Sequence, residues 1–414
     1  MTMKTDKIVT VIDIGSTKVC CCIANIFDDG KFQIIGVGYC VCLGVRAGII
    51  VDMKSVEQSL VNAVENAEKI ANFRVKSVYI NISGKSLESQ IINVGLNIDG
   101  RMIKNEDLLN LFEYCERDIG DRMVIHSIPI FYSVDSLHGV TNPIGMIAKS
   151  LNASMNLVTA PKVQLDNLLI CLAHCHLDPI GIVASIYASA LGTMGGDDLS
   201  TNQIVIDFGG ETTSIGFFYR GIFSGMETVP LGGNNITSDI AYGLNISTVN
   251  AERLKTLHGS AFVSIHDERD VVFAPVIEDD REVINLQRIS KSSLNQIIQP
   301  RVEEILDMAK RKIEKSTFTD NFSRNVIITG GGSMLAGIRD LASTILDKKI
   351  KIKRMEDFID GADIAINNNF SVAVGMIIFA QLGGDPSEKQ KKSTKRNKGV
   401  DFFKKTLAWV ENNL

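Results

Sequence analysis

One short pattern occurs twice in this chain, about half a chain apart. Around Asp13 the sequence reads VIDIGSTKV, and around Asp207 it reads VIDFGGETTSIG. In both copies an apolar run typical of a strand ends at Asp-x-Gly, a polar turn follows, and a second strand begins. A chain of 414 residues is too long for a single hydrophobic core. The repeat therefore predicts a duplicated α/β domain in which each half starts with the same strand–turn–strand unit.

The two turns have the composition of phosphate-binding loops. Small residues let backbone N–H groups point into a shared concavity that an anion can enter, and hydroxyl or lysine side chains add donors. Asp13 and Asp207 end strands predicted to face one another across a cleft, where they would hold a hydrated Mg²⁺. The other candidates are Gly15, Ser16, Thr17 and Lys18 in the first turn, with Lys18 as a point charge for a terminal phosphate, and Gly209, Gly210, Thr212 and Thr213 in the second.

A third glycine cluster strengthens this interpretation, because a single Asp-x-Gly turn is common and weak evidence. The stretch TGGGSMLAGI places Gly330, Gly331, Gly332 and Ser333 between a predicted strand and a predicted helix. Such a junction suits close approach of the backbone to a nucleotide. It has neither the pattern of a P-loop nor the spacing of a Rossmann fingerprint.

The order of these motifs resembles that of the actin, Hsp70 and sugar-kinase superfamily. DIGSTKV, DFGGETTSIG and ITGGGSMLAGI are similar to its two phosphate motifs and its adenosine motif, and AERLKTLHG is similar to its Ala-Glu-x-x-Lys helix. The resemblance implies that Glu252 and Lys255 contact ribose and adenine, with Gly232 and Gly233 in the same site. Within the superfamily the chain most resembles the FtsA family of bacterial cell-division proteins, through VYINISGKSLES, NPIGM and SDIAYGLNIS, and the resemblance extends over essentially the whole chain.

We therefore predict an α/β fold of actin-like, duplicated ribonuclease-H-like domains, with two inserted subdomains and a C-terminal amphipathic helix. The first lobe is expected to cover 1–83, 161–198 and about 372–384, and the second lobe 199–230 and 300–371. One inserted subdomain is expected at 84–160, where FtsA proteins carry a characteristic insertion. The other, at 231–299, is expected to be mostly helical, with a polar, acidic loop around 265–282. A basic linker at 385–399 and the amphipathic helix at 400–414 complete the chain.

Two departures from the superfamily bear on ATP chemistry. The second phosphate turn commonly has glycine where this chain has Glu211, and a carboxylate directed inward would repel phosphate. We expect the Glu211 side chain to face solvent. The stretch from Gly181 to Met194 offers no carboxylate or carboxamide to orient an attacking water. ATP is therefore expected to bind with slow or absent turnover. The alternative is a small-molecule, sugar-type kinase of the same superfamily; a pilus-assembly or plasmid-partition relative is a third, weaker option.

The resemblance also implies partners. FtsA-like proteins polymerise, bind the C-terminal peptide of the tubulin-like protein FtsZ through the later insertion, and recruit later divisome membrane proteins. It suggests Arg288 and Arg301 near the peptide groove, Arg301 because Pro300-Arg301 is expected to open a helix. Solvated surface arginines are the other interpretation. A net charge of −5 gives no indication of nucleic-acid binding.

The last thirty residues have the composition of a membrane anchor. Six basic residues occur within KQKKSTKRNK, and an amphipathic segment with the only tryptophan follows. The residues expected to enter anionic lipid are Phe402, Phe403, Leu407, Trp409 and Val410. No apolar run is long enough to span a bilayer. Eight cysteines without a signal-peptide core favour a reducing cytoplasm. We therefore expect a peripheral protein on the cytoplasmic face of the bacterial inner membrane at the division site; docking of the tail on the domain or on a second subunit is the alternative.

Overall fold

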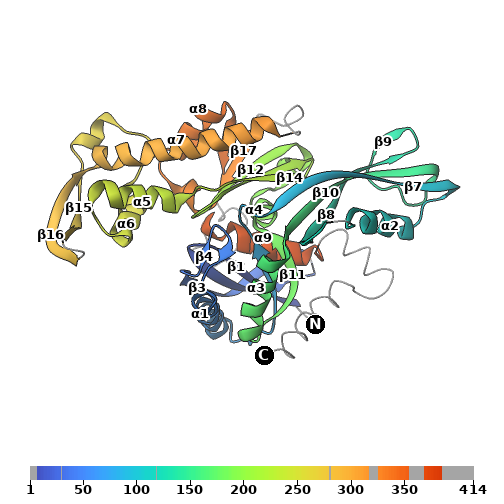
Figure 1. Cartoon of the computed structure of the whole chain (residues 1–414), viewed down its shortest axis with the longest axis horizontal. Helices are drawn as coiled ribbons and strands as arrows, with labels where there is room; N and C mark the ends of the chain where they lie inside the picture. Colours follow the sequence, from blue (N-terminus) through green and yellow to red (C-terminus); the bar gives the residue numbers. More distant parts are fainter. Residues whose placement is uncertain are drawn as a thin grey trace.

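The computed structural model describes residues 7–28, 30–117, 119–278, 281–316, 325–353 and 368–384. Two lobes lie at the centre of the molecule, and an arm extends from each side (Figure 1). The left arm carries α5, α6, β15 and β16, and the right arm carries β7 to β10 and α2. The predicted terminal segment from 385 to 414 lies outside the described residues.

The first lobe is built on a five-stranded sheet in the order β11-β6-β1-β2-β3. The first three strands along the chain form an antiparallel meander, and β6 and β11 add parallel to β1. Helix α1 covers one face through a buried stripe, and Asp52 caps its N-terminus by accepting a hydrogen bond from Ser55 N. The elements are β1 (Lys7–Ile14), β2 (Lys18–Ile26), β3 (Phe32–Val41), the short β4 (Val45–Arg46) and β5 (Ile49–Ile50), α1 (Met53–Ala71), β6 (Ser77–Ile82), α3 (Lys162–His174), β11 (Asp178–Ala184), α4 (Ser185–Thr193), η6 (Asn368–Phe370) and α9 (Ser371–Gln381).

The second lobe repeats this architecture. Its sheet has the order β14-β13-β12-β17-β18, again an antiparallel meander followed by two parallel strands. The repeated topology confirms the duplicated α/β fold that was predicted from the two Asp-x-Gly units. The elements are η1 (Gly196–Ser200), β12 (Gln203–Phe208), β13 (Thr213–Tyr219), β14 (Ile222–Val229), α7 (Lys291–Lys315), β17 (Asn325–Thr329), η4 (Gly331–Met334), α8 (Ile338–Leu346) and β18 (Lys349–Ile352).

The right arm is a four-stranded sheet in the order β7-β10-β8-β9 with one helix packed on it. It begins directly after β6 and returns to the first lobe at α3, so it interrupts that lobe. Asn156 of this sheet is buried and donates a 3.1 Å hydrogen bond to the carbonyl of Phe223 in β14, which joins the arm to the second lobe. The elements are β7 (Glu88–Met102), α2 (Asn105–Cys115), β8 (Arg122–Val134), β9 (Leu137–Val140) and β10 (Ile147–Pro161).

The left arm corrects one expectation. The stretch 265–282 was expected to be a polar loop in a mostly helical subdomain, but most of it belongs to a two-stranded antiparallel ribbon. Val272, Ala274 and Ile289 are buried on one face of the ribbon, and this period-two pattern explains why strands form despite the flanking charges. The elements are α5 (Gly233–Leu244), α6 (Thr248–His258), η2 (Ile265–Glu268), β15 (Val271–Glu278) and β16 (Arg281–Ser290).

Two central helices, α4 and α9, cross between the lobes (Figure 1). Their backbones approach so closely that a Cβ added at Gly375 would lie 1.6 Å from the carbonyl oxygen of Ala188. A Cβ at Gly192 would lie 2.4 Å from the carbonyl oxygen of Ser371. Only glycine fits at these crossing points, and the cleft between the lobes lies at the N-terminal ends of both helices.

Candidate nucleotide site

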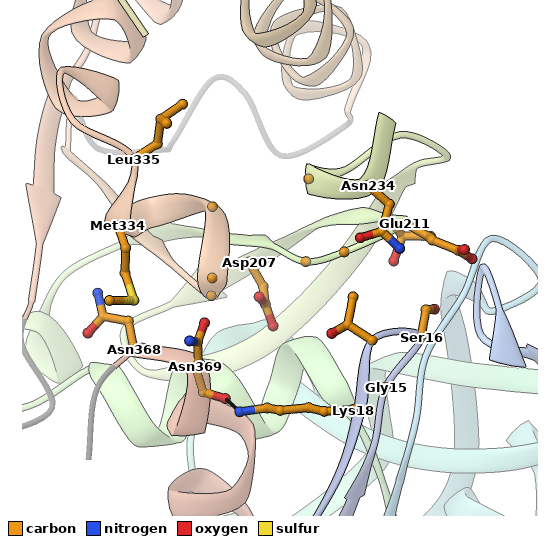
Figure 2. Close-up of a pocket in the computed structure, with 18 of the residues that line it drawn as sticks. Gly15, Ser16, Lys18, Asp207, Glu211, Asn234, Met334, Leu335, Asn368 and Asn369 are labelled. Atoms are coloured by element: carbon orange, nitrogen blue, oxygen red, sulfur yellow. Dashed lines mark hydrogen bonds between the residues drawn. The ribbon is translucent and has the colours of Figure 1, made fainter. Parts of the chain in front are cut away.

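A cavity of about 460 Å³ lies between the two lobes. Both Asp-x-Gly turns, the third glycine cluster, α6 and the segment before α9 contribute to its walls (Figure 2). The structure brings most of the predicted site residues together here. Those that line the cavity are Asp13, Gly15, Ser16, Thr17, Lys18, Asp207, Gly209, Gly210, Thr212, Gly233, Glu252, Lys255, Gly330, Gly331 and Gly332.

The two phosphate turns have the same internal hydrogen bond. Gly15 N donates to Lys18 O at 2.9 Å in the first, and Gly209 N donates to Thr212 O at 3.0 Å in the second. The bond closes each turn between two antiparallel strands and leaves small residues at the cavity wall. The repeat in sequence therefore corresponds to a repeat in local geometry.

Asp13 and Asp207 lie at the ends of β1 and β12, on opposite sides of the cavity. Burial raises the pKa of Asp13 to about 6, although Lys18 and Asn81 act to lower it. Burial and the charge of Asp13 raise the pKa of Asp207 to about 7. Two oxygen-donor carboxylates that are costly to ionise without a counterion form a donor set that suits Mg²⁺.

Asn81 supports the first aspartate and was not predicted. Its amide nitrogen donates to Asp13 Oδ1 at 2.6 Å and to Ser185 Oγ at 2.9 Å, and its oxygen accepts from Ile14 N at 2.7 Å. Asn81 is buried at the end of β6, which pairs with β1 in parallel. The signal in sequence was a lone polar residue inside the apolar run VYINIS.

Three predicted residues support the cavity wall without lining it. Thr213 is buried and donates to Leu231 O at 2.9 Å. A Cβ at Gly232 would lie 2.6 Å from the carbonyl oxygens of Gly209 and Gly210, so this glycine permits close packing under the second turn. Ser333 is buried and donates to Gly330 O at 2.7 Å.

The third glycine cluster approaches the second phosphate turn directly. Gly330 has a φ of +81°, and a Cβ there would lie 2.3 Å from Asp207 Oδ1. A Cβ at Gly332 would lie 2.4 Å from the ring of Phe208. Glycine is therefore required for the loop to reach the cavity, and Met334 and Leu335 follow it as an apolar wall.

Lysines on both sides of the cavity are held by backbone carbonyls. Lys18 Nζ donates to Asn369 O at 2.8 Å and lies 4.0 Å from the centre of the Phe370 ring. Lys255 Nζ donates to Gly233 O at 3.0 Å and lies 2.6 Å from Glu252 Oε2. Both are cationic groups at the wall of the site, and the role of Lys18 at a terminal phosphate stays a prediction.

The solvent-facing orientation expected for Glu211 is wrong. The side chain is half-buried, points away from the cavity centre, and accepts a hydrogen bond from the backbone N–H of Ala47 in the other lobe. The backbone N–H of Ala47 gives the carboxylate a hydrogen-bond donor that solvent-facing placement would not use. In this orientation the carboxylate repels a phosphate in the cavity less than an inward-pointing carboxylate would.

The two arginines predicted at a partner groove differ in their surroundings. Arg288 is exposed on β16, directly opposite Phe273 of β15, whose side chain is 57% exposed. Arg301 is held by Asp239 at 2.6 and 3.1 Å and also pairs with Glu304. The expectation that Pro300 opens a helix is wrong, because it lies inside α7, whose apolar stripe continues past it.

The predicted membrane residues Phe402, Phe403, Leu407, Trp409 and Val410 lie outside the described residues. Within the ranges that are described, no helix is long and apolar enough to cross a membrane.

Comparison with known families identifies relatives along almost the whole chain. The family described as "Cell division protein FtsA" matches residues 204–375, and the one described as "SHS2 domain inserted in FTSA" matches residues 84–159. The cell division protein FtsA of Agrobacterium fabrum is 34% identical over 396 residues, covering 92% of this chain and 89% of the relative. The FtsA of Escherichia coli K12 is 27% identical over 400 residues, covering 94% of each.

Solved structures share the fold at low identity. A PilM–PilN type IV pilus biogenesis complex matches with a TM-score of 0.65 and 15% identity, covering 90% of this chain and 98% of that one. MreB5 of Spiroplasma citri bound to AMPPNP matches with a TM-score of 0.55 and 13% identity, covering 94% and 99%. At these identities the likeness concerns the fold alone, and it supports the actin-like architecture.

Proposed function

The chain belongs to the FtsA family of cell division proteins, and from this premise we propose that it is an ATP-binding, polymerising scaffold that ties the FtsZ ring to the cytoplasmic membrane. The observation that supports nucleotide binding is the cavity between two equivalent turns, with Asp13 behind one turn and Asp207 behind the other. A solved neighbour of the same fold, MreB5, is described as bound to ADP in one structure and to AMPPNP in another.

The cavity offers distinct walls for the parts of a nucleotide. The turns at 15–18 and 209–212 supply backbone N–H groups and hydroxyls for phosphates. Glu252 and Lys255 lie where ribose and base would bind, and Met334 and Leu335 offer apolar surface to the base. Asp13 and Asp207 would hold Mg²⁺, which when bound supplies charge neutralisation for the phosphates.

Slow ATP hydrolysis is proposed because α4 places no water-orienting side chain at the cavity. Ser185 is the residue of this helix at the cavity wall, and its hydroxyl donates to Ile82 O at 3.1 Å while it accepts from Asn81. No carboxylate or carboxamide of α4 is available to orient a water, since its sequence contains none. A steady-state ATPase rate comparable to that of a dedicated kinase would contradict this part of the proposal.

A sugar-type kinase is the alternative, and the carboxylates at the cavity wall weigh against it. Such an enzyme needs a free carboxylate to accept the proton of the substrate hydroxyl. Among the described residues, four carboxylates line this wall: the predicted metal pair, Glu211, which accepts a hydrogen bond from Ala47 N, and Glu252, which pairs with Lys255. ATP hydrolysis stimulated by a sugar would favour the kinase.

The outward face of the β15–β16 ribbon supports binding of the FtsZ C-terminal peptide. Phe273 and Leu286 are 57% and 58% exposed, and Arg288 lies beside them on the same face. An arginine next to exposed apolar side chains suits a short peptide with acidic and apolar residues. Filaments formed with ATP, and recruitment of later divisome proteins, complete the proposed role.

The segment 385–414 is proposed to attach the protein to the membrane, and its basic and amphipathic sequence supports this role. Each basic residue near anionic lipid contributes about 1 kcal/mol before screening, and Trp409 suits the interfacial level. The test is vesicle pelleting of the full chain, of a truncation after Gly384 and of Trp409→Glu, with and without FtsZ. Only the full chain is expected to pellet and to bring FtsZ with it. Equal pelleting of the truncation would contradict tethering and would favour a membrane surface elsewhere.

A further inference from the structure

Glu211 makes a contact that a glycine in its place could not make. It follows Gly210 in the second phosphate turn, and its carboxylate crosses the cleft to the backbone N–H of Ala47 in the first lobe. Figure 2 shows the side chain directed away from the cavity, toward the strands of the first lobe. The contact joins two segments 164 residues apart in the chain. The phosphate turn is thereby tied to the opposite lobe.

Ala47 lies in a strained turn. It and Gly48 are the two central residues of the β4–β5 hairpin, with φ of +47° and +81°. Positive φ at both positions is typical of a type I′ turn, where asparagine or glycine is preferred and alanine is rare. A backbone held in such a conformation depends on its surroundings, and the Glu211 carboxylate is one of the groups that hold it.

The same hairpin is fixed to the beginning of the right arm. Gln164 Nε2 donates to Gly48 O at 2.8 Å and to Ser83 O at 3.2 Å. Ser86 Oγ donates to Gln164 Oε1 at 2.5 Å, and a Cβ at Gly84 would lie 2.4 Å from Ala47 O. The hairpin therefore contacts the junction at 83–86, from which β7 and the arm continue.

We propose that Glu211 is a latch that couples the charge of the bound nucleotide to this hairpin and, through Gln164, to the junction of the right arm. The inference rests on the proposed binding of nucleotide in the cavity. A carboxylate that leaves Ala47 moves toward the phosphates and is repelled by them. The latched state is therefore favoured most by a triphosphate, less by a diphosphate, and least by the empty cavity.

Amide hydrogen exchange tests the latch directly, because the Ala47 N–H is the donor. Peptides covering 44–51 are followed by mass spectrometry in the nucleotide-free protein and with Mg·ADP or Mg·AMPPNP. In the wild-type protein, protection is expected to rise in that order. In Glu211→Ala, exchange of this peptide is expected to be equally fast in all three states and about tenfold faster than in the wild-type protein with Mg·AMPPNP.

Glu211→Gln separates charge from hydrogen bonding. The neutral amide oxygen can still accept from Ala47, so the peptide should stay protected, but phosphates no longer repel the side chain. Protection that no longer depends on the nucleotide is therefore expected. A glutamine variant that keeps the full nucleotide dependence overturns the electrostatic coupling.

Gln164→Ala tests transmission to the arm. Leu87 N donates to Gly84 O at 3.3 Å, so peptides covering 84–88 report on the junction. Their exchange should respond to AMPPNP in the wild-type protein and lose that response in Gln164→Ala, while the 44–51 peptide still responds. A junction that never responds overturns transmission.

Calorimetric titration of the same samples distinguishes the two proposals. A wild-type protein that binds no nucleotide overturns both the nucleotide site and the latch. A protein that binds nucleotide while the 44–51 peptide exchanges equally in all states, and equally in Glu211→Ala, overturns the latch alone.

Discussion

Asp13 and Asp207 occupy equivalent strand ends in the two lobes, and the charge of Asp13 adds to burial in raising the pKa of Asp207 to about 7. Lys18 lowers the pKa of Asp13 only in part, leaving it at about 6, and among the described residues no cation lowers the pKa of Asp207. A bound divalent cation would therefore stabilise the ionised form of both carboxylates. Because their pKa values are about 6 and about 7, their protonation can be followed near neutral pH.

Affinity for Mg·ATP is expected to rise between pH 5.5 and 8. The cation binds the ionised carboxylates, and pKa values of about 6 and about 7 mean that protons must leave within this range. The expected gain is about tenfold, with net proton release on binding, measured by calorimetry in buffers of different ionisation enthalpy. Titration of ATP in EDTA is the control. When no Mg²⁺ is present, the two carboxylates become more negative as pH rises, and they should repel ATP more strongly. Affinity independent of pH would contradict the assignment of these carboxylates.

Asp207→Asn is expected to stabilise the protein without Mg²⁺ at pH 8. A carboxyl whose pKa is raised in the folded state binds its proton more tightly than in the unfolded chain. Its contribution to stability is therefore complete below about pH 4 and is lost as pH rises through 7. Removing the charge should raise the free energy of unfolding by about 2 kcal/mol, as measured by urea denaturation. At pH 4 the two proteins should be nearly equal, and a larger gain at pH 4 than at pH 8 would contradict the argument.

The duplicated fold could be predicted because its evidence is local and repeated. Each Asp-x-Gly turn lies between two largely continuous apolar runs that are typical of buried strands, and the matching sheets follow from that pattern. The orientation of Glu211 could not be predicted, since its partner Ala47 is 164 residues away and the contact depends on how the lobes meet. The ribbon at 271–290 was missed because the charged cluster at 278–282, where one strand ends and the other begins, was interpreted as part of a loop.

The glycine pair between α4 and α9 leads to a prediction about stability. Gly375→Ala is expected to lower the free energy of unfolding by about 3 kcal/mol, because the new Cβ would lie 1.6 Å from a backbone oxygen that cannot move alone. Gly243→Ala is the matched control in another helix, where the Cβ would lie 2.8 Å from the end of the Ile297 side chain. That side chain can rotate and alanine favours helix, so a change within about 1 kcal/mol is expected. Equal effects in thermal or urea unfolding would contradict a tight crossing.

The exposed ribbon face and the paired Arg301 predict different outcomes for the two arginines. Arg288→Glu is expected to weaken binding of the FtsZ C-terminal peptide at least about tenfold without changing the melting temperature, because Arg288 is exposed and forms no ion pair within the part of the chain that the structure describes. Phe273→Ser should also weaken peptide binding, because the peptide loses an apolar contact.

Arg301→Ala should instead lower the melting temperature, because Asp239 and Glu304 lose the guanidinium between them. Fluorescence anisotropy with a labelled peptide gives the affinity, and calorimetry gives the melting temperature. Loss of peptide binding in Arg301→Ala with an unchanged melting temperature would place the peptide on α7, away from the ribbon.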